Sequence, residues 1–206
     1  SFHQGLRYTD RETLEVTEMV LAGQVNKNLV GLLNLQGVRA VGLTGKDGLL
    51  FAAEKKQYGD IDLGLVGDIV ETDPDILETL ISAGFVPVIA PISMDADGES
   101  YNINADEAAV AVAAALQAEK LIYLTDVPGV LRDKDDDSTL ISRLKAVEAE
   151  QMIKEGGIVG GMVPKILCCI KAVRQGAGSA HIISGQQEHS LLLEILTAEG
   201  VGTVIE

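Results

Sequence analysis

The chain has 206 residues, of which 47% are hydrophobic and 23% are charged, and this globular composition excludes wholesale disorder. Its length fits one large domain or two smaller lobes. The 16 Lys and Arg residues against 31 Asp and Glu residues give a formal net charge of −15, so neither nucleic acid nor an anionic membrane is an expected partner.

A long N-terminal helix is the first predicted element. Thr9 and Glu12 have the spacing of a capping box, with Thr9 as the cap. Apolar residues then recur at helical spacing as far as Gly37. Gly23 and Gly31 lie inside this run and could divide it into two helices.

Strands and a second helix follow in the first half of the chain. Residues 38–43 predict a short strand, and residues 42–54 predict a hairpin that turns at 46–48. An Asp-Pro pair is typical of a helix start and predicts a helix over residues 73–84. Residues 86–92 are almost continuously apolar, as expected of a strand buried on both faces.

The second half of the chain alternates helices with strands. Such alternation predicts an α/β protein with a mainly parallel sheet. The predicted elements are helices over residues 105–117, 147–154 and 163–175, and strands over residues 121–124, 181–183 and 201–205.

A polar motif precedes the helix that begins at residue 105. Asn102, Asn104 and Asp106 alternate along the chain, so an extended backbone would place them on one face. Asn can hydrogen-bond a carboxylate or amide substrate, and a helix N-terminus attracts anions. The alternative is structural: Asn104 caps the helix and Asp106 interacts favourably with the helix dipole.

A glycine-rich segment covers residues 156–161 and leads into Pro164 and Lys165. Glycines let a backbone approach a ligand closely, and Pro164 is expected to begin a helix. A cation beside a helix N-terminus suits a phosphoryl group in transfer. The alternative is a flexible loop that carries a surface lysine.

Two further segments have the chemistry of a ligand site. Residues 124–130 follow a predicted strand, and ligands of open α/β sheets bind at that edge, although an ordinary turn explains the segment equally well. Arg7 precedes the first helix and could clamp a carboxylate, or it could be an ordinary surface arginine. His3, His181 and His189 lack the spacing of metal ligands, so no zinc site is expected.

Taken together, these segments resemble the N-acetyl-L-glutamate kinase branch of the amino acid kinase family, over essentially the whole chain. The segments that carry the resemblance are residues 2–10, 101–106, 124–130, 160–165, 189–194 and 199–203.

The resemblance implies a three-layer αβα sandwich with a mainly parallel central sheet. It implies an amino-acid-substrate lobe over residues 1–117 and a nucleotide-binding lobe over residues 118–206. The activity implied is phosphoryl transfer from ATP, with Mg²⁺, to the side-chain carboxylate of N-acetyl-L-glutamate, a step of arginine biosynthesis. The nucleophile is already ionised, so catalysis would consist of positioning and charge neutralisation.

Site residues follow from the same resemblance. Arg7 and Asn102 would bind the acceptor, together with Asn104 of the same motif. Lys165 would stabilise the transferring phosphoryl group, and Asp106 would orient the catalytic lysines. The residues implied to bind ATP are Thr125, Asp126, Val127, Pro128, Gly129, Val130, Gly157, Ile158 and Val159.

Regulation is also implied, because residues 164–171 look like those of the cyanobacterial and plant branch, which binds the signalling protein PII and is inhibited by arginine. The arginine effector would lie near His181, Glu194 and Gly200. Without that role, His181 would be a strand-end residue and Glu194 part of a solvated helix face. A homo-oligomer, either a dimer or a hexamer, is expected.

The family's pattern begins with a lysine-bearing strand and a glycine loop that precede the region matching Phe2. We therefore expect a chain that lacks its N-terminal portion and transfers phosphate poorly. Adjacent Cys168 and Cys169 disfavour a disulfide and suit a reducing cytoplasm. The alternatives are a kinase of the same fold with another acceptor (carbamate, aspartate, glutamate or UMP), or a non-catalytic module that binds arginine or PII.

Overall fold

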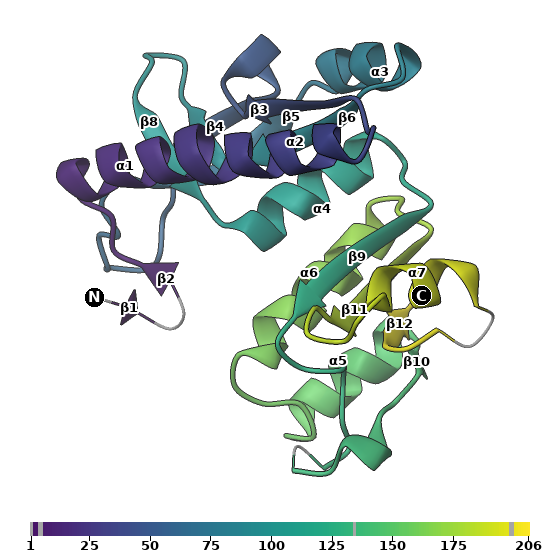
Figure 1. Ribbon diagram of the computed structural model, residues 1–206. Coiled ribbons are helices and arrows are strands. Elements are labelled where there is room, and N and C mark those ends of the chain that lie inside the picture. The colour runs from purple at the N-terminus through teal and green to yellow at the C-terminus, as the bar shows by residue number, and fades with distance from the viewer. Residues whose placement is uncertain (1, 4–5, 134, 198–199) are drawn as a thin grey trace. The chain divides into compact units, whose positions relative to one another are not determined.

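The computed structural model describes residues 2–3, 6–133, 135–197 and 200–206, and for residues 2–3 and 6–7 it describes backbone only. The chain divides into two compact units, Ser1–Leu116 and Gln117–Glu206 (Figure 1). The sequence placed this boundary after residue 117. The assignment of one unit to the acceptor and the other to the nucleotide stays a prediction.

One continuous helical run follows two short strands at the start of the first unit (Figure 1). It consists of α1 (Arg11–Glu18), a π-helical segment (Met19–Val25) and α2 (Asn26–Leu35). Gly23 lies in the π-helical segment and Gly31 in α2, so neither divides the run.

The cap of this run was predicted one residue too early. Asp10, not Thr9, is the N-cap, and its carboxylate accepts the Thr13 N–H at 2.8 Å. Thr9 is fully buried, and its backbone pairs with those of Leu63 and Leu65. That pairing holds Thr9 in extended backbone, so the helix begins after the next residue.

The strands of the first unit form separate sheets. β3 (Ala40–Thr44) pairs in parallel with β6 (Val86–Ala90). A small closed barrel has the order β4-β5-β8-β7. Its strands are β4 (Phe51–Lys55), β5 (Val66–Thr72), β7 (Ile92–Met94) and β8 (Ser100–Ile103).

The predicted hairpin over residues 42–54 is therefore wrong. Both of its strands exist as β3 and β4, but they belong to different sheets, and β4 pairs in antiparallel with β5. The Gly45 N–H donates to the Ile92 carbonyl at 2.7 Å, which ties the end of β3 to the start of β7. The apolar pattern predicted the strands but could not identify their partners.

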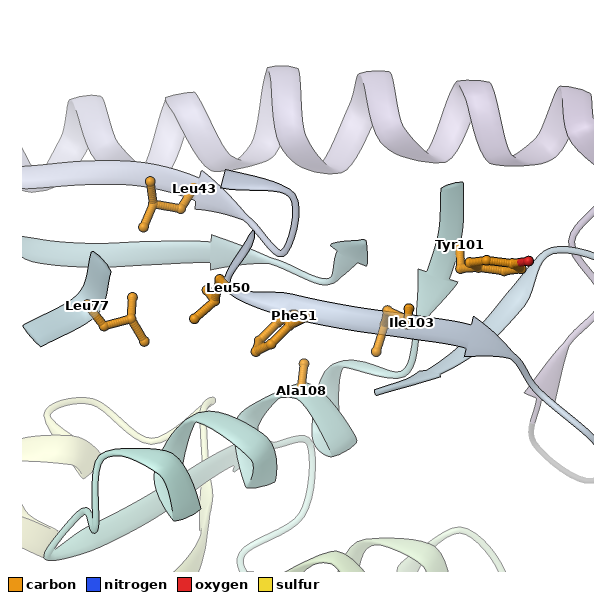
Figure 2. Close-up of a cluster of buried hydrophobic side chains, with 8 residues drawn as sticks. Leu43, Leu50, Phe51, Leu77, Tyr101, Ile103 and Ala108 are labelled. Carbon is orange, nitrogen blue, oxygen red and sulfur yellow. The ribbon is translucent and has the colours of Figure 1, made fainter. Parts of the chain in front are cut away.

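Two helices and two short strands complete the first unit. The helices are α3 (Asp75–Ser82) and α4 (Ala105–Ala115), close to their predicted positions, and the short strands are β1 (Phe2–His3) and β2 (Leu6–Arg7). The hydrophobic core of this unit lies between strands and helices (Figure 2). Its buried members are Leu43, Leu50, Phe51, Ala53, Leu77, Tyr101, Ile103 and Ala108.

A four-stranded sheet of order β10-β12-β11-β9 forms the second unit. β9 pairs in parallel with β11 and β10 in parallel with β12, whereas β12 is antiparallel to β11. The strands are β9 (Lys120–Thr125), β10 (Arg143–Leu144), β11 (Ser179–Ser184) and β12 (Thr203–Ile205), and the helices are α5 (Ala146–Lys154), α6 (Met162–Arg174) and α7 (Ser190–Leu196).

The α/β class and the prevalence of parallel pairing are confirmed. The strands β1, β2, β5, β7, β8 and β10 and the helix α7 were not predicted as separate elements. Five of these strands are only two to four residues long. In the part of the chain that the structure describes, no helix has the length and apolar character of a membrane span.

Candidate functional site

A cavity of about 460 Å³ in the second unit joins two of the predicted nucleotide segments. One wall comes from the loop after β9 and the other from the loop between α5 and α6. The lining residues are Val127, Gly129, Val130, Leu131, Arg132, Asp133, Gly156, Gly157, Ile158, Val159 and Met162. Six of the nine predicted ATP residues thus meet around one cavity, and Thr125, Asp126 and Pro128 lie outside its lining.

The first wall is shaped by a turn at the carboxyl end of β9. The Thr125 hydroxyl accepts the Val127 N–H at 2.9 Å and donates to the Val127 carbonyl at 3.1 Å. These two hydrogen bonds form a tight turn directly after the strand, as threonine hydroxyls commonly do. Thr125 therefore shapes the turn whose next residue, Val127, lines the cavity.

Gly129 packs against Thr203, a contact that the sequence did not predict. Its φ is 155°, and a Cβ there would lie 2.5 Å from Thr203 Oγ1. That hydroxyl is buried, accepts the Val130 N–H at 2.8 Å and donates to the Ile141 carbonyl at 2.7 Å. Thr203 thus anchors the first wall to β12, and no spacing pattern indicated this role.

The second wall is the glycine-rich loop after α5. Gly156 has a φ of 76°, and the Gly157 N–H donates to the Met152 carbonyl at 2.8 Å. Ile158 is buried and Val159 is exposed. The loop therefore has a defined turn geometry, with apolar side chains at the cavity.

Lys165 lies just beyond this loop, in α6. The helix begins at Met162, whose side chain lines the cavity, and its N-cap is Gly161. Lys165 is half-buried, and its Nζ lies 4.9 Å from the centroid of the Tyr123 ring. Lys165 itself is not among the lining residues, so the structure places it one turn away from the cavity wall.

In the first unit, the predicted acceptor motif spans β8 and the start of α4. The Asn102 side chain donates to Thr9 Oγ1 at 3.3 Å, and its N–H donates to the Leu65 carbonyl at 2.9 Å. Arg7 has its backbone in β2, and its side chain lies outside the described residues. The Thr9 contact brings the segment that carries Arg7 close to Asn102.

Asn104 has the structural role that was the alternative for it. Its side chain caps α4 and accepts the N–H groups of Asp106 at 2.9 Å and Glu107 at 3.1 Å. Asp106 is half-buried in the first turn of the helix. An acceptor-binding role for Asn104 stays a prediction, as do the roles of Asn102 and Asp106.

A lysine that was not predicted as a site residue lies beside this motif. The Lys56 Nζ forms ion pairs with the Asp68 carboxylate and, at 3.3 Å, with Glu107 Oε1. Burial by itself lowers the pKa of Lys56, but its hydrogen bond to Asp68 and the charge of Glu107 outweigh burial and raise the pKa above its usual value. Two adjacent lysines in an acidic chain gave no indication that one of them is half-buried between two carboxylates.

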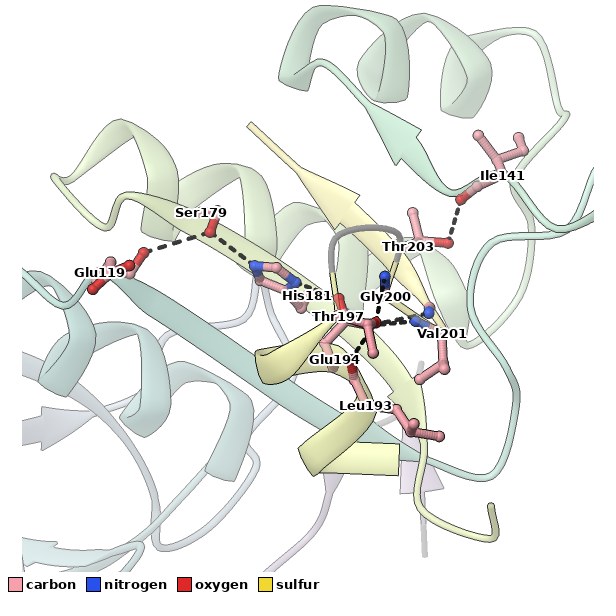
Figure 3. A network of polar contacts seen from close by, with 11 residues as sticks. Glu119, Ile141, Ser179, His181, Leu193, Glu194, Thr197, Gly200, Val201 and Thr203 are labelled. Atoms are coloured by element: carbon pink, nitrogen blue, oxygen red, sulfur yellow. Dashed lines mark hydrogen bonds and ion pairs between the residues drawn. The ribbon is translucent and has the colours of Figure 1, made fainter. Parts of the chain in front are cut away.

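All three residues predicted for the effector come together in the second unit (Figure 3). His181 Nδ1 lies 2.6 Å from Glu194 Oε1, and Glu194 Oε2 accepts the N–H groups of Val201 at 2.7 Å and Gly202 at 3.2 Å. The φ of Gly200 is 67°, and a Cβ there would lie 2.6 Å from Glu194 Oε2. Glycine is therefore required beside this carboxylate.

The carboxylate of Glu194 is buried, so the alternative of a solvated helix face is wrong. Burial by itself raises the pKa of Glu194, but the Val201 N–H, the His181 ring and the Gly202 N–H outweigh it and lower the pKa below its usual value. Glu194 is therefore held as an anion, with three donors arranged around it.

A cavity of about 370 Å³ lies against this cluster. It carries both charge signs, and Arg143 pairs with Glu206 at 2.6 Å on its wall. The lining residues are Glu119, Lys120, Arg143, Gly178, Ser179, His181, Glu194, Thr197, Gly200, Val204 and Glu206.

Comparison with known proteins assigns the family. The model of the amino acid kinase family matches residues 1–184. An acetylglutamate kinase of Synechococcus sp. (strain CC9311) is 52% identical over 204 residues, which cover 99% of this chain and 71% of that protein.

Two solved structures of N-acetylglutamate synthase from Neisseria gonorrhoeae are also similar. One, complexed with coenzyme A and N-acetyl-glutamate, is 30% identical with a TM-score of 0.88, over 100% of this chain and 46% of that chain. The other, complexed with coenzyme A and L-arginine, is 26% identical with a TM-score of 0.78, over 100% of this chain and 48% of that chain. By its sequence match and its structural likeness, the chain belongs to the amino acid kinase family.

Proposed function

We propose that the chain catalyses transfer of the γ-phosphoryl group of ATP to the side-chain carboxylate of N-acetyl-L-glutamate, a step of arginine biosynthesis. The observation that carries the proposal is the identity of 52% over 204 residues to proteins named acetylglutamate kinase. The cavity between the loop after β9 and the loop after α5 supports it, because six of the nine residues that the family resemblance assigns to ATP meet there.

The chemistry needs no general base, because the acceptor carboxylate is ionised at neutral pH. Its oxygen attacks the γ-phosphorus, the bond to the β–γ bridging oxygen breaks, and ADP leaves while an acyl phosphate forms. The barrier arises mainly from bringing two anions together, so positioning and charge neutralisation lower it. On a chain with a net charge of −15, that neutralisation must be local.

The second unit would bind the nucleotide. Apolar side chains such as Val130 and Ile158 suit an adenine ring, and Gly157 allows close approach of backbone N–H groups to phosphate. Lys165, near the N-terminus of α6, would stabilise negative charge on the transferring group.

The first unit would bind the acceptor. Arg7 would pair with the α-carboxylate and Asn102 would hydrogen-bond the same molecule, with Asn104 holding the helix that follows. The Asn102 to Thr9 hydrogen bond supports this pairing, because it joins β8 to the segment that contains Arg7. Asp106 would orient the catalytic lysines.

Mg²⁺ belongs to the proposal as a companion of ATP. Among the described residues, no group of three or more His, Cys, Asp or Glu side chains is arranged to hold a metal ion. The described residues therefore do not fit an all-protein metal site. This agrees with the usual binding of Mg²⁺ by substrate phosphates together with one or two carboxylates.

Arginine is the effector that we propose for the cavity beside Glu194. A free amino acid with a cationic side chain needs carboxylates for its two cationic groups and a cation for its carboxylate. The cavity offers Glu119, Glu194 and Glu206 together with Lys120 and Arg143. Binding of PII, assembly into a dimer or hexamer and a cytoplasmic location complete the proposal.

A coupled ADP-release assay on the full encoded protein tests the function. The acceptors compared are N-acetyl-L-glutamate, L-glutamate, L-aspartate, carbamate and UMP. We expect turnover with N-acetyl-L-glutamate and little with the others, because Arg7 and Asn102 suit an acylated amino acid. Preference for another acceptor would replace the proposed substrate, and nucleotide binding without turnover on any acceptor would support the regulatory alternative.

A further inference from the structure

Lys56, the half-buried lysine beside the predicted acceptor motif, has two carboxylate partners, whereas its neighbour Lys55 lies at an exposed position. Lys56 follows β4 directly, and its N–H donates to the Val66 carbonyl of β5 at 2.8 Å. Its side chain is 14% exposed and lies between the Asp68 carboxylate of β5 and the Glu107 carboxylate of α4. One ammonium group thus joins a strand of the barrel to the first turn of a helix.

The first turn of α4 carries Asp106, the last residue of the predicted acceptor motif, and Glu107. Asn104 accepts the N–H groups of Asp106 and Glu107, so the two residues are fixed to the same cap. Glu107 is adjacent in sequence to Asp106, and a contact that fixes the Glu107 side chain limits rotation of the turn that carries Asp106.

The barrel holds the other end of the same motif. β5 pairs in parallel with β8, with Val66 opposite Asn102 and Gly67 opposite Ile103. Asp68, the strand partner of Lys56, is the next residue of β5. The motif is therefore tied to β5 at Asn102 through backbone pairing, and at Glu107 through Lys56.

We propose that Lys56 is a positioning residue for phosphoryl transfer, which holds the first turn of α4 and thereby the Asp106 carboxylate. The inference rests on the proposed function. Lys56 acts through Glu107 and Asp106 and need not touch either substrate. The Lys56 side chain is 14% exposed and the side chains of Asp68 and Glu107 are 39% and 30% exposed, so this ammonium is less accessible to water than that of an exposed lysine, which exchanges its partner for water readily.

Lys55 supplies a matched control. It is the preceding residue, and it pairs with Asp62 at 2.9 Å, with exposed side-chain fractions of 44% and 71%. Loss of an exposed pair of this kind has little effect. Lys55→Met and Lys56→Met therefore remove the same functional group from neighbouring positions with different burial.

The first measurement is amide hydrogen exchange by NMR on the full chain. In Lys56→Met, we expect exchange at the Asp106 and Glu107 amides to be about tenfold faster or more, while Lys55→Met leaves them unchanged. Exchange in β11 reports whether the second unit remains folded. If Lys56→Met does not fold, Lys56→Gln and Lys56→Arg are measured, with protection in the order Arg above Gln.

The second measurement separates kcat from KM in the full encoded protein. We expect Lys56→Met to lower kcat about ten- to a hundredfold, with KM for N-acetyl-L-glutamate and ATP nearly unchanged and with partial rescue by Lys56→Arg. A structural role alone would lower the amount of folded enzyme and leave kcat per folded molecule unchanged.

The two readouts keep the inference and the proposed function apart. A wild-type protein without kinase turnover refutes the function, while the exchange data alone still decide whether Lys56 holds the turn. Unchanged exchange at Asp106 and Glu107 in Lys56→Met overturns the inference. So does a normal kcat in that variant when the wild type is active.

Discussion

Replacing Glu194 by Gln removes one negative charge from a buried cluster and leaves its shape almost unchanged. Glu194 is 3% exposed, and its carboxylate accepts two backbone N–H groups on one oxygen and faces His181 with the other (Figure 3). A Gln at this position can keep its carbonyl oxygen toward Val201 and Gly202 and turn its amide toward His181.

The cost follows from the three hydrogen bonds. A hydrogen bond to a charged group contributes about 1.5–3 kcal/mol and one between neutral groups about 0.5–1.5 kcal/mol. His181 can accept from the Gln amide at Nδ1 if its Nε2–H donates to Ser179 Oγ, which lies 2.8 Å away, so this contact survives in neutral form. The loss over the three hydrogen bonds is about 3–4.5 kcal/mol. Part of it is offset because a neutral amide is less costly to bury than a carboxylate, so we expect Glu194→Gln to lower the free energy of unfolding by about 2–3 kcal/mol at pH 7.

The stability difference between wild type and Glu194→Gln depends on pH. The pKa of Glu194 is lower in the folded chain than in the unfolded chain. Its contribution is therefore fully present above the unfolded pKa of about 4.3 and disappears as the pH falls through the folded pKa. The stability gap between wild type and Glu194→Gln should shrink as the pH is lowered below about 4.

Urea denaturation followed by circular dichroism measures both effects, at pH 7, 5 and 4 and below, as far as the protein stays folded. Glu150→Gln is the control: Glu150 forms surface hydrogen bonds of 2.8 and 3.0 Å to Arg174, and because this pair is exposed its loss should change stability little. A Glu194→Gln variant as stable as wild type, or a gap that persists unchanged into acid, would refute the account of this cluster.

Three further substitutions test other parts of the structure. Asn104→Ala should lower stability by about 1 kcal/mol through loss of the α4 cap, whereas Asn104→Asp should keep it, and thermal melts compare the two. Gly129→Ala should weaken ATP binding and lower the melting temperature, because its Cβ would meet Thr203 Oγ1 at 2.5 Å; calorimetric titration with unchanged ATP affinity would contradict this. Lys165→Ala should lower kcat about a hundredfold or more with substrate binding nearly intact, while Lys171→Ala, exposed on the same helix, should be normal in steady-state assays.

Periodicity and capping chemistry predicted most helices and several strands. The run from Arg11 to Leu35 and the helix after Asn104 are examples, because their patterns are local. Strand pairing was not predictable in this way: β3 and β4 have the sequence of a hairpin but belong to different sheets. The partner of a strand depends on residues distant in sequence, which a local pattern does not contain.

The residues of the candidate site were likewise only partly predictable from the sequence. Gly129 and Gly157 were named from the sequence, and both line one cavity. Thr203, which anchors the wall of that cavity, and Lys56, which contacts Asp68 and Glu107, were missed. Both act through contacts between segments far apart along the chain, and neither residue type has a spacing that marks such a role.

Amide hydrogen exchange with and without an ATP analogue tests the central claim most directly. The claim is that the loop after β9 and the glycine loop after α5 form one nucleotide site. We predict that the analogue slows exchange in residues 127–133 and 156–162 together, and that Lys171→Ala behaves as wild type. Slowed exchange confined to other residues of the second unit, or saturating binding with no protection in either loop, would contradict the claim.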